Sequence, residues 1–189
     1  DNTSFGANAL SSSGSATSGA NNTAIGSNAL QANAASNNTA VGYQAGYANT
    51  TGGITSLGYQ AGYANTTGTY NTAIGNHALY SNTTAGRNTA IGQQAGENNT
   101  TGHITAVGAL VLNVNSTGTG NTGVGGNDEA ISAALQSNTT GNYNIAVGTG
   151  ALQANTTASN NTAVGYQAGA GITTGTNNVM LGYSTGGDR

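Results

Sequence analysis

A hydrophobic residue followed by glycine recurs at nearly constant spacing along the whole chain, and this periodicity restricts the possible folds more than any other feature. Eleven copies align on this pair, and their glycines lie 16 or 17 residues apart except for two intervals of 20 and 23. One copy is too short to bury a core alone, so the repeat predicts that copies stack on one another. The aligned glycines are Gly6, Gly26, Gly42, Gly58, Gly75, Gly92, Gly108, Gly125, Gly148, Gly165 and Gly182.

The composition alone would suggest disorder, because Asn, Thr, Ser, Ala and Gly dominate and only 2 Lys plus Arg and 5 Asp plus Glu occur in 189 residues. A disordered low-complexity chain would not keep so regular a register. The net charge of −3 provides no basic patch, so we expect no nucleic-acid partner. No apolar run is long enough to span a membrane, so we expect no membrane contact by this segment.

Within each copy, the pattern predicts a strand, a glycine corner, a second short extended piece and a loop. In "NTAIG", Thr and Ile lie on one face of a strand and Asn, Ala and Gly on the other. The fixed glycine suits a corner with positive φ. We interpret the following "YQAG" as the second extended piece and "NTTG" as loop chemistry. We expect Ile, Val and Leu of the strand to form an interior ladder.

Stacked copies of this kind predict one all-β domain over 1–189, a parallel β-solenoid of about eleven rungs of 16–17 residues. Each strand would pair with its equivalents about 4.8 Å above and below. Asn and Thr ladders could then pair amide to amide and hydroxyl to hydroxyl. The two long intervals predict extra loop residues around 11–20 and 126–133, the latter as a helical turn or a bulged loop. The thin core predicts an oligomer.

The segments "NTAIGSNAL", "NTAVGYQAG", "NTAIGNHAL" and "NTAIGQQAG" resemble the head repeats of trimeric autotransporter adhesins, and related repeats in phage and predatory-bacterial fibres. This resemblance implies a left-handed parallel β-roll wound as a homotrimer, exposed on a cell surface or virion and serving cell adhesion. The implied partners are further copies of the chain and a host-surface glycan or matrix protein. We expect the chain to be a segment of a longer extracellular fibre.

Tyrosines recur at two places of the repeat and are the candidate ligand contacts. Exposed tyrosines can bind sugar faces or partner surfaces. In the alternative interpretation, they fill a groove between subunits or cover the ladder. Four follow the corner glycine directly and two lie four residues later: Tyr43, Tyr59, Tyr166 and Tyr183, then Tyr47 and Tyr63.

No residue pattern indicates catalysis, a cofactor or a metal. His77 and His103 lie in different copies, without Cys or acidic residues at ligand spacing. Asp128 and Glu129 are adjacent but too few for a Ca²⁺ site. Because no Ser, His and acid combination with a supporting motif occurs either, the sequence predicts a protein that is not an enzyme.

Twelve Asn-x-Ser/Thr sequons occur, more than composition alone predicts, although inheritance of "NNT" and "NTT" by each copy also explains them. Those in predicted loops would be accessible to a glycosylating enzyme. These are Asn49, Asn65, Asn82, Asn138 and Asn155.

Three functions remain open. The leading hypothesis is a non-enzymatic fibre or adhesin head segment, and the alternative is a phage or predator tail fibre that recognises host glycans. Ice binding ranks lowest, because the threonine ladder shares its strand face with Ile and Val, which we expect to be buried. The ladder consists of Thr3, Thr23, Thr39, Thr55, Thr72, Thr89, Thr105, Thr122 and Thr162.

Overall fold

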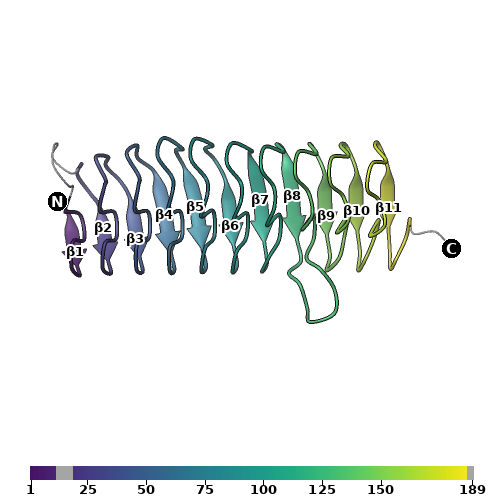
Figure 1. Ribbon diagram of the computed structural model, residues 1–189, viewed down its shortest axis with the longest axis horizontal. Coiled ribbons are helices and arrows are strands. Elements are labelled where there is room, and N and C mark those ends of the chain that lie inside the picture. Colours follow the sequence, from purple (N-terminus) through teal and green to yellow (C-terminus); the bar gives the residue numbers. More distant parts are fainter. Residues whose placement is uncertain (12–18, 187–189) are drawn as a thin grey trace.

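A single parallel sheet of eleven short strands runs the length of a rod, with the first and last strands, β1 and β11, at its opposite ends (Figure 1). The computed structural model describes residues 1–11 and 19–186. The strands are paired in chain order. Their bounds are β1 Thr3–Phe5, β2 Thr23–Ile25, β3 Thr39–Val41, β4 Ile54–Leu57, β5 Asn71–Ile74, β6 Thr89–Ile91, β7 Ile104–Val107, β8 Asn121–Val124, β9 Ile145–Val147, β10 Thr162–Val164 and β11 Val179–Leu181.

The pairing register places each residue next to its equivalent in the neighbouring copies. Between β6 and β7, for example, Thr89 pairs with Thr105 and Ala90 with Ala106. The same register holds across the insertion between β8 and β9, where Val124 pairs with Val147. The described residues therefore form an all-β parallel solenoid of about ten turns without a helix, as the repeat predicts. At about 4.8 Å per strand, the rod is about 50 Å long.

Each coil contains one strand, so the prediction of a second extended piece is wrong. The segment after the corner glycine forms a turn instead. In the third coil, Gln44 (φ 52°) and Gly46 (φ 59°) both adopt the left-handed conformation, which reverses the chain and is incompatible with an extended strand. The corner itself is as predicted: Gly42 has φ 134°, and a Cβ there would lie 2.4 Å from the carbonyl oxygen of Gly58.

The strands are oriented opposite to our expectation, with Ala and the first residue of the repeat, usually Asn, inside and the Ile, Val or Leu before the corner glycine outside. Asn88 and Ala90 of the sixth coil are fully buried, whereas Ile91 is 39% exposed. Neighbouring coils repeat this pattern, with Ala73 and Ala106 buried. We attribute the arrangement to the narrow coil, in which small alanines face the turn and asparagine amides find partners.

The interior contains a continuous column of asparagine side chains. Each Nδ2 donates to the Oδ1 of the preceding member over distances of 2.7 to 3.2 Å, which confirms the predicted amide pairing. The column ends at Asn155, whose Oδ1 has no partner, because the next copy has Ile172 in this place. Its members are Asn33, Asn49, Asn65, Asn82, Asn99, Asn115, Asn138 and Asn155.

A second set of buried asparagines stands at the start of the strands and connects this column to the backbone. Asn71 donates from Nδ2 to Oδ1 of Asn65 (3.0 Å), and its own Oδ1 accepts from the backbone N–H of Asn88 (2.9 Å). The threonine hydroxyls of the loops do not pair with one another as expected. Thr66, for instance, donates its hydroxyl to the carbonyl oxygen of Thr83 in the next coil (3.0 Å).

Most of the larger apolar side chains of the core come from the turns. Buried leucines such as Leu79 and glycines such as Gly96 share one repeat position, in irregular order along the rod. A Cβ on Gly96 would lie 2.5 Å from Cδ1 of the buried Ile104, so the isoleucine occupies the space that a leucine would need. A large residue of a neighbouring strand thus fills the space beside this glycine.

The insertion at 126–133 is a loop that projects from the rod between β8 and β9 (Figure 1). It contains no helical turn, so the loop alternative of the prediction is confirmed. Asp128 holds the loop by accepting the backbone N–H groups of Ala130 (2.9 Å) and Ile131 (2.6 Å) through Oδ1. Most of the other predicted extra segment, around 11–20, lies outside the described residues.

The interior column predicts a sharp difference between two adjacent asparagines. Asn99 donates to Oδ1 of Asn82 and to the carbonyl of Gly102 and accepts from Asn115, whereas the neighbouring Asn98 is exposed. We expect Asn99→Ala to lower the free energy of unfolding by about 2–4 kcal/mol, because it leaves buried polar groups unpaired.

The matched control is Asn98→Ala, which should change stability by no more than about 0.5 kcal/mol. Urea denaturation followed by circular dichroism measures both variants. Equal free energies of unfolding for the two variants would contradict a stabilising role of the interior amides.

Candidate functional site

Seven of the nine tyrosines form two short columns along one side of coils three to five and a further pair at the C-terminal end. Tyr43 and Tyr59 stack with ring centroids 5.4 Å apart and an interplanar angle of 17°. Tyr47, Tyr63 and Tyr80 form the second column, with successive centroids 5.1 Å apart. The sequence analysis missed Tyr80, although it lies five residues after its corner glycine, as Tyr47 and Tyr63 do.

A similar stack joins Tyr166 to Tyr183, whose centroids lie 5.3 Å apart at an angle of 13°. Parallel stacking along the rod turns the ring faces toward neighbouring rings within each column. A sugar ring that packs on an aromatic face would thus find free faces mainly at the column ends. The role of the tyrosines as ligand contacts remains a prediction.

A chain of hydrogen bonds runs along the rod beside the tyrosines. Gln60 donates from Nε2 to Oε1 of Gln44 (2.7 Å), and Oε1 of Gln60 lies 2.9 Å from Nε2 of His77. Nδ1 of His77 lies 3.1 Å from Oε1 of Glu97, whose Oε2 accepts from Nδ2 of Asn113 (2.9 Å). The sequence analysis found no acidic partner for His77, because Glu97 is separated from it by 20 residues and reaches it only through stacking.

His77 also joins the two tyrosine columns. Its ring centroid lies 5.5 Å from that of Tyr59 and 4.8 Å from that of Tyr80. Together, the rings and the hydrogen-bonded chain form a compact surface in which most polar groups already have partners.

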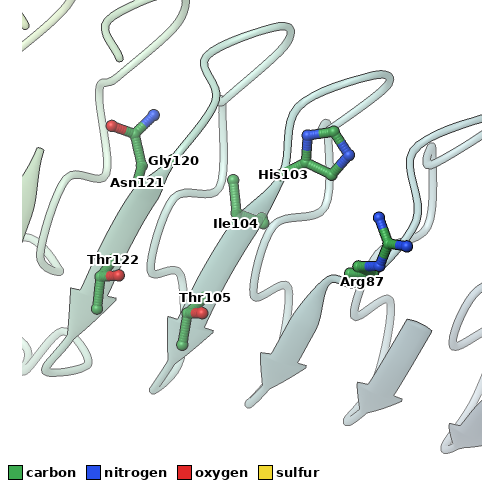
Figure 2. A pocket seen from close by; sticks show the side chains of 7 residues that line it. All are labelled: Arg87, His103, Ile104, Thr105, Gly120, Asn121 and Thr122. Atoms are coloured by element: carbon green, nitrogen blue, oxygen red, sulfur yellow. The ribbon is translucent and has the colours of Figure 1, made fainter. Parts of the chain in front are cut away.

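Neither histidine belongs to a metal cluster. Nδ1 of His103 lies 3.2 Å from Oγ1 of Thr119, and Asp128 is used by its own loop. Across residues 1–11 and 19–186, no three His, Asp or Glu side chains gather at a place that could hold a metal ion. Two shallow cavities are present, one of about 220 Å³ beside the 126–133 loop and one of about 210 Å³ next to Arg87 and His103 (Figure 2).

The five asparagines expected to be accessible for glycosylation are inside the solenoid, so that expectation is wrong for the folded chain. Their side chains are 0% exposed and belong to the interior amide column. The sequence pattern "NTT" was interpreted as loop chemistry, but its asparagine faces inward at each coil. The residues concerned are Asn49, Asn65, Asn82, Asn138 and Asn155.

Within the described part of the chain, no helix has the length and apolar character needed to cross a membrane. Comparison of the chain with protein-family models, with curated proteins and with solved structures gives no significant match.

The stacked column predicts a pH dependence that can be assigned to one hydroxyl. Burial raises the pKa of Tyr63 above its usual value of 10.0, and Tyr80, Tyr47 and Tyr43 raise it further through charge repulsion. The unfolded chain therefore releases this proton first, so the contribution is complete below pH 10.0 and is lost as the pH rises through the pKa of the folded state.

We expect the denaturation midpoint to fall between pH 9 and about pH 11, and to fall less in Tyr63→Phe, which keeps the ring but lacks the proton. Urea titrations of both proteins at the two pH values measure the difference. An identical fall in the two proteins would contradict the assignment to Tyr63.

Proposed function

We propose that the chain is a non-enzymatic extracellular fibre segment, a rigid rod of stacked coils that provides surface adhesion or spacing. In this proposal, three copies assemble side by side into the left-handed trimeric β-roll that the resemblance to adhesin heads implies.

The outward face of the sheet carries an apolar ladder over the length of the rod, and this is the observation that supports the proposal. Its members stand in register on consecutive strands and are exposed by roughly two fifths, as in Leu57 (45%), Ile91 (39%) and Val164 (39%). Contiguous apolar surface of this extent is unusual on a monomer and marks an interaction site.

A further copy of the same chain is the occupant that fits this ladder best. The ladder repeats with the period of the coils, and a second solenoid presents ridges and grooves with the same period. Burying these side chains also compensates for the small alanine and asparagine core within each coil. Closed cyclic assembly would cover the face in every copy, which a non-repetitive partner could not do along the whole rod.

Mass measurement tests the assembly. We expect the purified chain to sediment at about three times the 18.3 kDa of one chain. Ile74→Asp combined with Val107→Asp should shift it to monomer, because buried unpaired carboxylates in the interface are strongly unfavourable. Both positions are on the outward face, in β5 and β7.

The control places the same two charges on exposed loops of the same spacing, as Thr67→Asp with Thr101→Asp. This variant should keep the mass of the parent. Monomeric parent protein at micromolar concentration, or a parent-like mass for the Ile74/Val107 variant, would overturn the proposed interface.

Ice binding gains support from one observation and is the second candidate. The reason for ranking it lowest was wrong, because the threonine ladder is on the outward face. Eight consecutive strands, from β1 to β8, carry threonine in the same register, from Thr3 to Thr122. A regular array of hydroxyl and methyl groups could order water, but only if no further chain covers it.

Because the trimer covers this face, we expect no thermal hysteresis in a nanolitre freezing assay. Hysteresis that disappears in Thr72→Tyr and Thr105→Tyr but persists in the loop variant Thr67→Tyr would favour ice binding and would contradict the trimer.

A further inference from the structure

The cavity of about 210 Å³ lies at the amino-terminal ends of three neighbouring strands, β6 to β8 (Figure 2). Arg87 and His103 stand before β6 and β7, and Gly120 stands at the same place before β8. Thr105 and Thr122 lie further along the strands and complete the lining. A Cβ on Gly120 would lie 2.5 Å from Cδ1 of Tyr143, so the tyrosine ring of the next coil lies against this glycine.

Arg87 is at a repeat position where the backbone is left-handed, with φ 60°. Other copies have Asn37 and Asn160 in the same conformation here, and also the long side chains of Tyr70 (φ 61°) and Tyr143 (φ 56°). The backbone therefore accepts a long side chain at this position, and Arg87 differs from its equivalents by its charge.

No group of the described chain uses the guanidinium. Arg87 is exposed, and no side-chain hydrogen bond or ion pair is formed by it among the described residues. The chain has 2 Lys plus Arg in total, and the other, Arg189, lies outside the described residues. Glu97 is already paired with His77. A free cation is thus placed beside an open cavity on a chain with net charge −3.

His103 supplies a second nitrogen on the next coil. Its Nδ1 lies 3.2 Å from Oγ1 of Thr119, which fixes the ring and leaves Nε2 for another partner. A planar guanidinium, a ring N–H and the hydroxyls of Thr105 and Thr122 match a group with several anionic oxygens. Because the cavity is smaller than those that enclose whole drug-sized ligands, it suits one charged substituent of a longer molecule.

We propose that this cavity binds the sulfate or carboxylate substituent of an acidic polysaccharide. The inference rests on the proposed function, because it assigns the adhesive ligand of the same rod. Arg87 and His103 lie at the amino-terminal ends of the strands (Figure 2), at the edge of the sheet face, so their charged and polar groups stay accessible when further copies cover the threonine ladder, including Thr105 and Thr122.

The test uses the full chain, after its mass has been measured, in calorimetric titrations at low salt. The probes are a sulfated galactan, the same galactan after desulfation, and polygalacturonate. We expect binding of at least one anionic polymer, weakened by added salt, and none of the neutral polymer. Binding of the sulfated polymer alone assigns sulfate, and binding of the uronate alone assigns carboxylate. Binding of neither, or equal binding of the neutral polymer, overturns the proposal.

Two matched variants distinguish binding at this cavity from binding that needs only a positive charge somewhere on the rod. Arg87→Asn introduces the residue that other copies carry here, so it should keep the fold and the mass while weakening binding about tenfold or more. Arg87→Asn with Asn160→Arg restores the charge at the same repeat position of another coil. Binding restored by this double variant, or unchanged in Arg87→Asn, would overturn the site. If the chain has the mass of a trimer but binds no polymer, the proposed ligand is wrong and the proposed trimer is unaffected.

Discussion

The stacking of asparagine amides inside the coils is the interaction on which the rest of the structure depends. Most of these amides donate to the one before them and to a nearby backbone carbonyl, so that buried polar groups are paired without any charged residue. Because an amide has both donors and an acceptor, the same residue can be repeated without repulsion. The interaction requires equivalent residues to stand directly above one another, and this requirement imposes the parallel register and the constant copy length.

Much of the architecture could be predicted from the sequence because the regular repeat period indicates stacked coils. The hydrophobic-Gly pair gave the number of strands, their register and the corner at Gly42. The direction of the side chains could not be predicted this way, since "NTAI" alternates and either face can be the inner one. Hydrophobicity favoured Ile91 inside, but the width of the coil admits Ala90 and Asn88 instead.

The candidate sites show the same division. Positions within one copy, such as Tyr43 and Tyr59, could be aligned and their proximity expected. The pairing of His77 with Glu97 involves different repeat positions on neighbouring coils, and the structure was needed to show that Arg87 has no ion-pair partner among the described residues. The repeat thus predicts the frame, whereas contacts between residues that depart from the repeat could not be predicted from it.

The corner glycines restrict how a rod of this kind can change by mutation. A Cβ on Gly75 would lie 2.4 Å from the carbonyl oxygen of Gly92, and a Cβ on Gly92 would meet Gly108 at 2.5 Å, so a substitution at one corner is opposed by the next coil. Duplication or loss of one entire copy creates no such conflict where neighbouring copies have the same corner contact, as at Gly75 and Gly92. The length of the rod can therefore change in steps of one coil, whereas its cross-section is held fixed by the close contacts between corners.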